Sequence, residues 1–347
     1  MKPLILAYYL PQFHEIPENN LWWGKGFTEW TNINNCKEYF TQHKIRKSIQ
    51  PLGQYMLLED GVIEKQFEIA KEYKIDGFMI WDYWFGDGDR ILEKPLEKIL
   101  DDDINVDYCL AWANHSWMNK SKGILLKEQK YLGANDYTAY FNYLLPHFKR
   151  SNYLKINNKP IFSIFMPSDV LDLDVFIETF EKLAKMHGFA GIHWLAENSK
   201  GNEEYISFFN NYYNSGKLLA ERRFRGINYF LEYINRKTKD RFKLGPFVYS
   251  FKKLDEISAK KTLGEKELPV IFSGWDSSIR HDTRGIILNE FDEASFDKHL
   301  ESIKKQINEN VPVIILKSWN EWAEGNLLEP DSIFGLKLLE ILREKFK

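Results

Sequence analysis

The sequence predicts an α/β protein with the (β/α)8 architecture of a TIM barrel, formed by residues 1–347 as a single domain with long βα loops. Two observations lead to this prediction. Short apolar runs recur eight times along the chain, most of them followed by an amphipathic helical pattern, as in parallel strands joined by crossover helices. Polar and aromatic residues follow most of these runs, whereas an open doubly wound sheet, the main alternative, would concentrate them at one switch point.

The expected strands are spread over the whole chain. They cover residues 4–9, 77–81, 106–112, 160–165, 191–196, 246–250, 269–274 and 312–318. Amphipathic helices are expected at 59–74, 135–150, 168–187, 291–308 and 333–346, where apolar residues recur at helical spacing. Residues 199–244 are rich in Tyr and Asn and then basic, and we expect them to be irregular with some helix.

Segment 11–52 follows the first expected strand and is long for a connection within a compact domain. It carries three tryptophans, Trp22, Trp23 and Trp30. Long connections without clear structure are usually functional or disordered, and the tryptophans argue against disorder. We therefore expect this segment to form the wall or lid of a binding cleft, with an insertion that only packs against the domain as the alternative.

Charge and composition limit the classes of partner. The formal net charge is −3 with both signs interspersed, so neither a nucleic acid nor an anionic lipid surface is expected to bind. No apolar stretch approaches the roughly eighteen residues of a membrane-spanning helix. The first residues show no signal-peptide pattern, which predicts a cytoplasmic protein unless a signal peptide has been removed. Cys36 and Cys109 are too few for a disulfide framework, in agreement with a reducing compartment.

Residues 317–325, Lys-Ser-Trp-Asn-Glu-Trp-Ala-Glu-Gly, follow the last expected strand and place two carboxylates three residues apart. Cleavage of a glycosidic bond needs one carboxyl group that donates a proton and a second, ionised one that assists at the sugar. Neighbouring indoles raise the pKa of a carboxyl group, whereas amide donors favour its charged form. Glu321 and Glu324 are therefore predicted to be catalytic. A solvated helix face or a capping glutamate is the structural alternative.

Further motifs occur in order along nearly the whole chain. They are Leu-Pro-Gln-Phe-His at 10–14, Trp-Gly-Lys-Gly-Phe-Thr-Glu-Trp at 23–30, Ile-Asp-Gly-Phe at 75–78 with Tyr-Trp-Phe at 83–85, Ala-Trp-Ala-Asn at 111–114, Gly-Trp-Asp at 274–276 with Arg280, and Leu-Glu-Pro-Asp at 328–331. Together with the motif around Glu321 and Glu324, they resemble the WbsX-type proteins. That group is similar to the endo-α-mannosidase-like glycoside hydrolases of family 99.

The resemblance implies a (β/α)8 barrel and a retaining glycoside hydrolase that acts on α-mannoside-like glycans. In the hydrolase relatives, one glutamate acts as a base on the sugar 2-hydroxyl, which attacks C1 to give a 1,2-anhydro sugar, and a second glutamate acts as an acid. Carried over by motif position, Glu321 is the base, and Glu324 is the acid that later activates water. This route departs from the usual retaining scheme, in which a carboxylate bonds to the anomeric carbon.

The matching motifs also contain ten candidates for contacts with an oligosaccharide or polysaccharide substrate. They are Tyr9, His14, Trp30, Tyr83, Trp84, Asn114, Trp275, Asp276, Arg280 and Asn320. Aromatic residues make up 16% of the chain, and carbohydrate sites use such rings as flat platforms. Structural alternatives remain open: Tyr83 and Trp84 as core, His14 as a turn histidine, and Asp276 with Arg280 as an ion pair that closes a loop.

A different function is also consistent with the resemblance, because WbsX-type proteins are commonly described as glycosyltransferases of surface-polysaccharide (O-antigen or capsule) synthesis. Such enzymes often hold a divalent ion with an Asp-x-Asp pair, and Asp87-Gly-Asp89 has that form. The pair lies in a glycine-rich stretch, where aspartates are ordinary turn residues. A non-catalytic glycan-binding barrel is the alternative of another class. The histidines are scattered without ligand spacing, so no metal and no other cofactor is expected.

Overall fold

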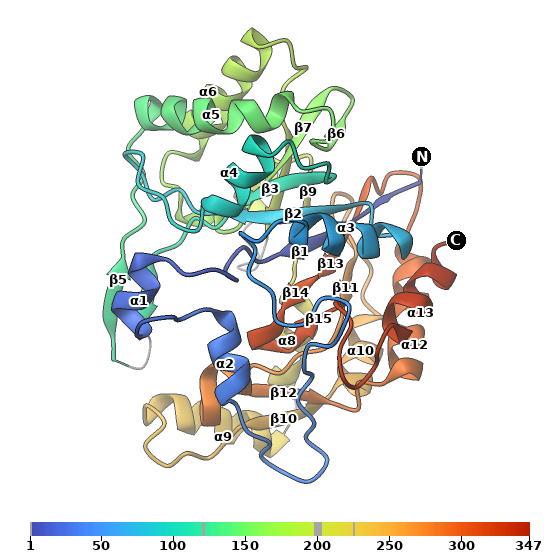
Figure 1. Cartoon of the computed structure of the whole chain (residues 1–347). Helices are drawn as coiled ribbons and strands as arrows, with labels where there is room; N and C mark the ends of the chain where they lie inside the picture. The colour runs from blue at the N-terminus through green and yellow to red at the C-terminus, as the bar shows by residue number, and fades with distance from the viewer. Residues whose placement is uncertain (1, 120–121, 198–202, 225) are drawn as a thin grey trace. The chain divides into compact units, whose positions relative to one another are not determined.

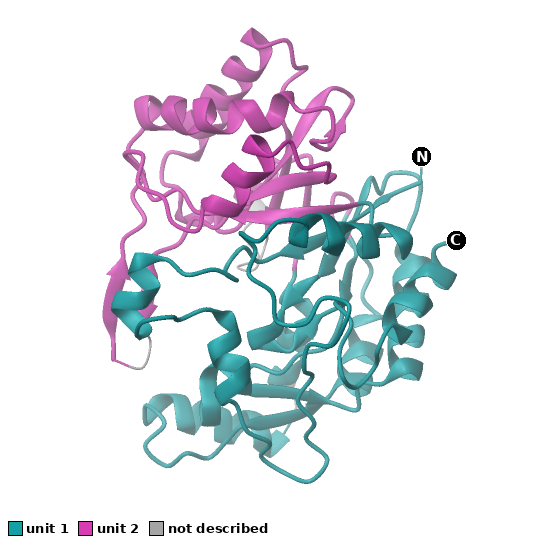
Figure 2. Ribbon diagram, viewed as in Figure 1, with its two compact units in different colours: residues 1–76, 215–264, 269–347 teal, residues 77–214, 265–268 magenta. Residues whose placement is uncertain are grey.

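The computed structural model describes residues 2–119, 122–197, 203–224 and 226–347. The chain divides into two compact units (Figure 2). Unit 1 consists of residues 1–76, 215–264 and 269–347, and unit 2 of residues 77–214 and 265–268. That the two units work as one catalytic domain stays a prediction. Among the described residues, no helix has both the length and the apolar composition needed to span a bilayer.

The sheet of unit 1 joins the beginning of the chain to its end. Strand β1 (Leu4–Tyr9) runs parallel to β13 (Val313–Lys317), with Leu4 opposite Val313, and β11 (Val270–Phe272) lies on the other side of β13 (Figure 1). These strands are continuous apolar runs that are buried almost throughout, as expected for parallel strands covered on both faces. The carboxyl ends of β13 and β11 thus lie next to each other, because the strands are parallel neighbours.

Helices of unit 1 that were predicted from apolar periodicity are confirmed, with shorter bounds. They are α3 (Val62–Glu72), α12 (Glu293–Gln306) and α13 (Lys337–Lys345). The start of α12 has a local cause: Asp292 accepts a hydrogen bond from the Ser295 backbone N–H, and the Ser295 hydroxyl group bonds back to Asp292 N–H. Helix α12 packs against α13 and β11, so that it covers the sheet of unit 1.

The remaining elements of unit 1 are short. Segment 11–52 contains helices α1 (Pro17–Trp23) and α2 (Glu29–Asn35). Residues 215–264 contain α8 (Lys217–Ala220), η2 (Glu221–Phe224), α9 (Gly226–Lys237), β10 (Phe247–Ser250) and α10 (Phe251–Ser258). After β11 come α11 (Ser278–His281), η3 (Asp282–Arg284) and β12 (Ile286–Asn289). After β13 come β14 (Asn320–Glu321), η4 (Trp322–Glu324) and β15 (Asn326–Leu327).

Unit 2 is built on a run of parallel strands. These are β2 (Gly77–Asp82), β3 (Tyr108–Trp112), β7 (Lys159–Ile164), β8 (His193–Glu197) and β9 (Asn211–Tyr213), each paired with the next. Its helices are α4 (Lys94–Asp101), α5 (Ala134–Lys149), η1 (Pro167–Asp169), α6 (Leu173–Met186) and α7 (Glu203–Ile206). Two hairpins complete the unit: β4 (Trp117–Asn119) with β5 (Ile124–Lys127), and β6 (Lys155–Ile156) with β7.

The main-sheet strands, eight among the described residues, have the order β11-β13-β1 within unit 1 and β2-β3-β7-β8-β9 within unit 2, with helices between them in the sequence. One predicted strand is wrongly placed. The run 246–250 forms β10, which pairs only with β12 in a separate small sheet, and β9 takes its position in the main sheet. Strand β9 lies in the segment expected to be irregular. Its three residues, Asn-Tyr-Tyr, are too few and too polar to produce a strand pattern, and its partner β8 specifies it instead.

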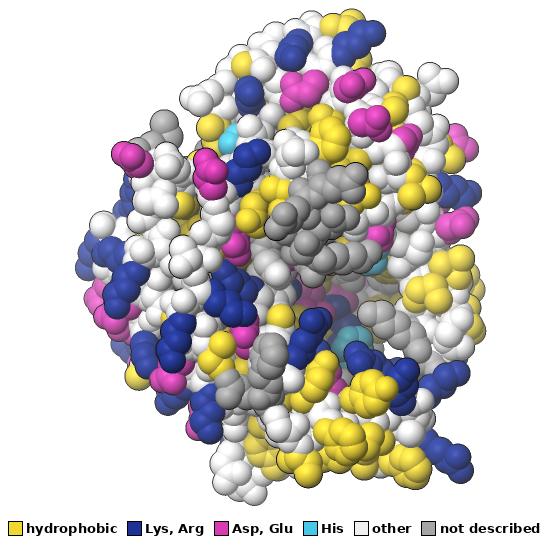
Figure 3. All heavy atoms as spheres, turned by 180° about the vertical axis from the view of Figure 1, so that it is seen from behind, with side chains coloured by type: hydrophobic (Ala, Val, Ile, Leu, Met, Phe, Trp, Pro, Cys, Tyr) yellow, Lys and Arg dark blue, Asp and Glu magenta, His cyan; other side chains and the backbone are white. Residues whose placement is uncertain are grey.

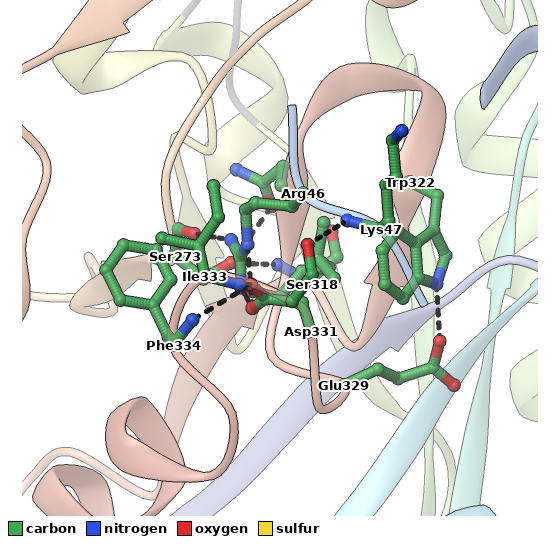
Figure 4. Close-up of polar contacts among 12 residues, drawn as sticks. Arg46, Lys47, Ser273, Ser318, Trp322, Glu329, Asp331, Ile333 and Phe334 are labelled. Carbon is green, nitrogen blue, oxygen red and sulfur yellow. Dashed lines mark hydrogen bonds and ion pairs between the residues drawn. The ribbon is translucent and has the colours of Figure 1, made fainter. Parts of the chain in front are cut away.

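A buried ion pair ties segment 11–52 to the end of the chain in unit 1 (Figure 4). Arg46 Nη2 donates to Asp331 Oδ2 at 2.8 Å, and only 8% and 1% of the two side chains are exposed. The same guanidinium group donates to the carbonyl oxygens of Ser273 and Leu327 at 2.8 and 2.9 Å. Asp331 also accepts from the backbone N–H groups of Ile333 and Phe334. Each charge is therefore compensated, as a buried charge must be.

We predict that Arg46→Met destabilises the protein by about 3–5 kcal/mol, because the Asp331 carboxylate would stay buried without its partner. Lys337→Met is the matched control, since it removes a solvent-screened pair with Glu340 and is expected to leave stability almost unchanged. Urea unfolding of both variants gives the comparison. Similar losses in the two variants would contradict the assignment of Arg46 and Asp331 as a structural anchor.

Candidate active site

The two predicted catalytic glutamates lie in a tight hairpin that follows β13 in unit 1. Strand β14 pairs with β15, and η4 forms the turn between them, so that Glu321 and Glu324 flank this turn. The Asn320 side chain fastens the hairpin to the chain after β1, because it accepts from Leu10 N–H at 2.7 Å and donates to the Leu10 carbonyl oxygen at 3.1 Å. The hairpin is therefore held by the residue that directly follows β1.

Arg280 binds both glutamates. Its Nη1 donates to Glu324 Oε1 at 3.1 Å, and its Nη2 donates to Glu321 Oε1 at 3.2 Å. Of the side-chain surfaces, 27% of Arg280, 11% of Glu321 and 19% of Glu324 are exposed. The predicted pair is thus brought together at one guanidinium group and stays accessible from outside.

A third carboxylate, Glu29, completes the cluster and was not predicted as a site residue. It is the first residue of α2, it is buried, and its Oε2 accepts from Arg280 Nη2 at 3.3 Å and from Asn32 Nδ2 at 3.2 Å. Helix α2 packs against η4 and α11, which places Glu29 beside the hairpin. The signal in the sequence was the position of Glu29 in the motif at 23–30, next to Trp30.

Burial and the charges of this cluster shift the pKa values of Glu321 and Arg280. With all four groups ionised, three carboxylates and one guanidinium would sum to −2. Burial, and after it the charge of Glu324, raises the pKa of Glu321 to about 7, although Arg280 opposes this shift. Burial lowers the pKa of Arg280, but Glu29, Glu324 and Glu321 outweigh that effect and hold it above its ordinary value. Arg280 is therefore a permanent cation, and Glu321 changes its protonation near neutral pH.

Asp276 does not pair with Arg280, so the ion pair considered from the sequence is absent between these two described residues. Its Oδ2 binds His43 Nε2 at 2.7 Å, and its Oδ1 accepts from the Ser278 N–H and hydroxyl groups at the start of α11, which carries Arg280. Tyr39 N–H donates to His43 Nδ1, so Nε2 bears the proton that Asp276 accepts. Asp276 thus orients the short helix that presents Arg280.

Gly325 allows the hairpin to approach Asp276. Its φ is +58°, and a Cβ at this position would lie 2.7 Å from Asp276 Cβ and 2.9 Å from Asp276 N. In this arrangement Asp276 N–H donates to the Glu324 carbonyl oxygen at 2.7 Å. Only glycine combines this backbone conformation with so close an approach. The backbone of the second glutamate is thereby fixed to the segment that leads into α11.

Trp322, between the two glutamates, is held from below by a buried carboxylate (Figure 4). Its indole N–H donates to Glu329, which is 1% exposed. Glu329 also accepts from the Tyr55 hydroxyl group at 3.0 Å and from Gln66 Nε2 at 2.6 Å. Burial raises the pKa of Glu329 to about 7, even though these donors favour its charged form. The hydrogen bonds of Glu329 therefore hold Trp322, and with it the turn that carries the two glutamates, in place.

The other predicted substrate-binding residues of unit 1 surround this hairpin in different ways. Tyr9 is buried and donates its hydroxyl hydrogen to Gln66 Oε1, and His14 is buried as well. The Trp30 ring lies 5.5 Å from the Trp322 ring, and its indole N–H donates to the Tyr55 carbonyl oxygen. Trp275 is half-buried, with the Lys317 ammonium group 4.9 Å from its ring centroid. These residues lie along the segments that enclose the hairpin.

Three predicted substrate-binding residues belong to unit 2. The Trp84 ring stacks on Tyr140, and its indole N–H donates to Asp136 at 3.2 Å. Tyr83 contacts Trp117 edge to face. Asn114 donates to the Met166 carbonyl oxygen and accepts from the Met166 N–H group. Trp84 and Asn114 thus have partners within unit 2, and their contact with a substrate stays a prediction.

The Asp-x-Asp pair lies in a turn of unit 2. Asp87 has a φ of +55°, and Asp89 binds the Lys127 ammonium group at 2.7 Å. Both side chains are exposed. Among the residues described by the structure, no group of three His, Cys, Asp or Glu side chains is arranged to hold a metal ion.

Comparison with known proteins identifies the family. A family model described as "Glycosyltransferase WbsX" matches residues 5–342. The chain belongs to this family. Two proteins named "Uncharacterized protein WxcX", from two strains of Xanthomonas campestris pv. campestris, are each 28% identical over 359 residues. The matches cover 98% of the chain and 49% of each WxcX protein, so the chain spans about half the length of these relatives.

Solved structures similar to this WbsX-family chain share its fold. A "Glycoside hydrolase-like protein" matches with a TM-score of 0.61 at 12% identity, over 100% of this chain and 94% of its own. The GH99 endo-α-mannosidase from Bacteroides thetaiotaomicron matches with a TM-score of 0.57 at 11% identity, over 99% and 97% of the two chains. At such identities the likeness concerns the fold alone. The predicted (β/α)8 class is thereby confirmed.

We predict that Glu329 makes stability depend on pH. Its pKa is about 7 in the native state against an ordinary value of 4.5, so the native state binds more protons between these values. The contribution of Glu329 to stability is therefore fully present below pH 4.5 and is lost as the pH rises through 7. Glu329→Gln should remove about 3 kcal/mol of this change.

Urea unfolding of wild type and Glu329→Gln from pH 4 to pH 8 measures the difference in slope. Glu340→Gln, at an exposed carboxylate, is the control and should keep the wild-type slope. Parallel pH profiles for wild type and Glu329→Gln would show that Glu329 has no raised pKa.

Proposed function

We propose that the protein is a retaining glycoside hydrolase that acts on α-mannoside-like glycans. The observation that carries this proposal is the hydrogen bonding of Glu321 and Glu324 to the same guanidinium group, with the pKa of Glu321 raised to about 7. Membership of the WbsX family and the fold shared with a GH99 endo-α-mannosidase support a carbohydrate substrate. Catalysis by two carboxyl groups requires no metal ion.

In the proposed first step, Glu321 takes the proton of the sugar 2-hydroxyl group. The 2-oxygen then attacks C1 and forms a 1,2-anhydro sugar, while Glu324 donates a proton to the leaving glycosidic oxygen. A carboxylate with a pKa of about 7 is a stronger base than an ordinary glutamate and is still ionised at neutral pH in a large fraction of molecules. Burial of Glu321 thus raises its pKa and makes it a stronger base.

In the proposed second step, the ionised Glu324 accepts a proton from water, which attacks C1 and opens the anhydro ring. Glu321 returns its proton to the 2-oxygen, and the configuration at C1 is retained after two inversions. Arg280 stays charged throughout, and its hydrogen bonds to both glutamates limit the repulsion between them. Glu29 accepts a hydrogen bond from Arg280 and so keeps the guanidinium group within reach of both Glu321 and Glu324.

The ten predicted substrate-binding residues are part of this proposal, with segment 11–52 as a wall of the site. The half-buried Trp275 would offer an apolar ring face to a sugar, and the buried Trp30 would support the site through its contact with Trp322. Asp276 and Asn320 would in addition hold the elements that carry Arg280 and Glu321, because their side chains are bonded to Ser278 and Leu10. The mechanism requires a free 2-hydroxyl group on the sugar whose glycosidic bond is cleaved.

Glycosyl transfer is the second candidate function, favoured by the description of the family model. It would place the protein in the cytoplasmic synthesis of a surface polysaccharide. The pairing of Asp89 with Lys127 and the exposed position of Asp87 argue against a metal site for a nucleotide-sugar diphosphate. A non-catalytic glycan-binding barrel would leave the buried, charge-coupled glutamates without a function.

Time-resolved proton NMR of the anomeric region, with the enzyme and α-mannan, tests the proposal. Reducing-end signals of retained configuration are expected, and Glu321→Gln or Glu324→Gln should slow their appearance by about three orders of magnitude or more. Glu340→Gln is the matched control and should react like wild type. Activity near wild type in both active-site variants would end the two-carboxylate mechanism. Consumption of a sugar nucleotide in the presence of an acceptor, without hydrolysis of glycans, would move the assignment to glycosyl transfer.

A further inference from the structure

Helix α9 of unit 1 turns its polar side toward the protein. Its buried residues are Glu232 and Asn235. Glu232 is bonded to two N–H groups of the Arg222 guanidinium at 3.1 Å and to the Tyr249 hydroxyl group at 2.9 Å. Asn228, on the same side, donates to the Val248 carbonyl oxygen. A surface helix of a globular protein normally presents its apolar side to the core, so α9 is inverted.

The opposite side of α9 presents large apolar residues to solvent. Ile227, Phe230 and Tyr233 recur every three residues and are 72%, 59% and 44% exposed. The segment after the helix adds Phe242 and Leu244, with 60% and 40% exposed. Exposed apolar residues gathered in this way mark an interaction site more often than single ones do.

The chain returns past the end of α9 in a fixed conformation. Asn235 donates to Asp240 Oδ1 at 2.8 Å and accepts from the Leu244 N–H group at 3.2 Å. Asp240 also accepts from the Thr283 hydroxyl group. These bonds hold Phe242 and Leu244 close to the last turn of the helix.

Cations accompany the apolar residues. Residues 226–244 contain five exposed basic side chains, Arg236, Lys237, Lys239, Arg241 and Lys243. The two acids of this segment are engaged inside the protein, Glu232 by Arg222 and Asp240 by Thr283. Five positive and two negative charges give the segment a formal charge of +3, whereas the whole chain carries −3. Figure 3 shows hydrophobic and Lys or Arg side chains side by side in the lower part of the face seen from behind.

We propose that residues 226–244 form a docking surface for an anionic phospholipid bilayer. Aromatic and aliphatic side chains of an interfacial helix enter the boundary between headgroups and acyl chains, while lysines and arginines along the same segment bind the phosphates. The inverted helix α9 and the basic segment that follows it provide both components on one surface. This inference does not depend on the proposed function, since the residues concerned are not part of the candidate active site.

The charge pattern favours a lipid surface over a protein partner. The cores of protein interfaces are depleted in lysine, and this segment carries three exposed lysines among its apolar residues. The net charge of the whole chain led us to expect no anionic lipid as a partner. That expectation used the net charge of the whole sequence and overlooked a segment whose two acids are hydrogen-bonded within the protein and whose five cations are all exposed.

The test is co-sedimentation of the whole chain with vesicles. We expect binding to vesicles of phosphatidylcholine containing about one third phosphatidylglycerol, weaker binding as salt is added, and little binding to phosphatidylcholine alone. The double variant Phe230→Glu/Phe242→Glu places acids within the apolar surface and should reduce the bound fraction about tenfold or more. Lys237→Ala/Lys239→Ala/Lys243→Ala should abolish the preference for anionic vesicles.

Leu171→Glu is the matched control, because Leu171 is 94% exposed and lies in unit 2. It should bind vesicles like wild type, and all variants should keep the circular dichroism spectrum of the folded protein. Absence of binding to anionic vesicles would overturn the proposal, as would equal binding by wild type and the double variant. Self-association that Phe230→Glu/Phe242→Glu abolishes, without vesicle binding, would assign the surface to a second copy of the chain instead.

Discussion

One guanidinium group among three carboxylates is the interaction on which the site depends. Arg280 binds Glu29, Glu321 and Glu324, which come from α2 and from the hairpin after β13. Without this cation, three acids would face one another in a largely buried place, and their repulsion would raise their pKa values or push the segments apart. The position of α2, of α11 and of the hairpin relative to one another within unit 1 is thus an electrostatic requirement as well as a matter of packing.

Polar side chains next to the cluster form hydrogen bonds and ion pairs with one another. Glu329 accepts hydrogen bonds from Trp322, Tyr55 and Gln66. The pair of Arg46 and Asp331 ties the long segment 11–52 to the residues after β15. Buried polar groups of this kind stabilise one arrangement of the chain over its alternatives only when every member has a partner. These hydrogen bonds hold the side chains after β13 in place, and a site for acid and base chemistry requires such fixed positions.

The sequence predicts those elements of the fold that have long, regular patterns of apolar residues. Strands β1 and β13 and helix α12 have strong local patterns, whereas the three residues of β9 depend on their neighbour β8. The run of β10 looked like a barrel strand because apolar alternation reports burial and not the identity of the partner strand. No local pattern distinguishes pairing with β12 from pairing within the main sheet.

The sequence indicates that Glu321 and Glu324 lie close together, because they are three residues apart, and the structure places both at the Arg280 guanidinium group. Glu29 and Arg280 are far apart in the sequence, and only the fold shows that they share an ion cluster. Asp276 was expected to contact Arg280 directly or to line the cleft, and the structure instead pairs it with His43. The proposed docking surface on α9 could not be predicted, because the sequence does not show which side of the helix is buried. In the structure the buried residues are polar, and the exposed side carries apolar and basic residues.

The central claim, that the Arg280 charge lowers the pKa of the buried Glu321 carboxyl group, can be tested without a substrate. Carbon-13 NMR of protein labelled at the glutamate carboxyl groups follows the titration of Glu321, with Glu321→Gln to assign its signal. The account predicts a midpoint near pH 7 in the wild type and a higher one in Arg280→Gln, because the guanidinium charge lowers the pKa of Glu321. A wild-type midpoint near the ordinary value of 4.5, or equal midpoints in the two proteins, would contradict it.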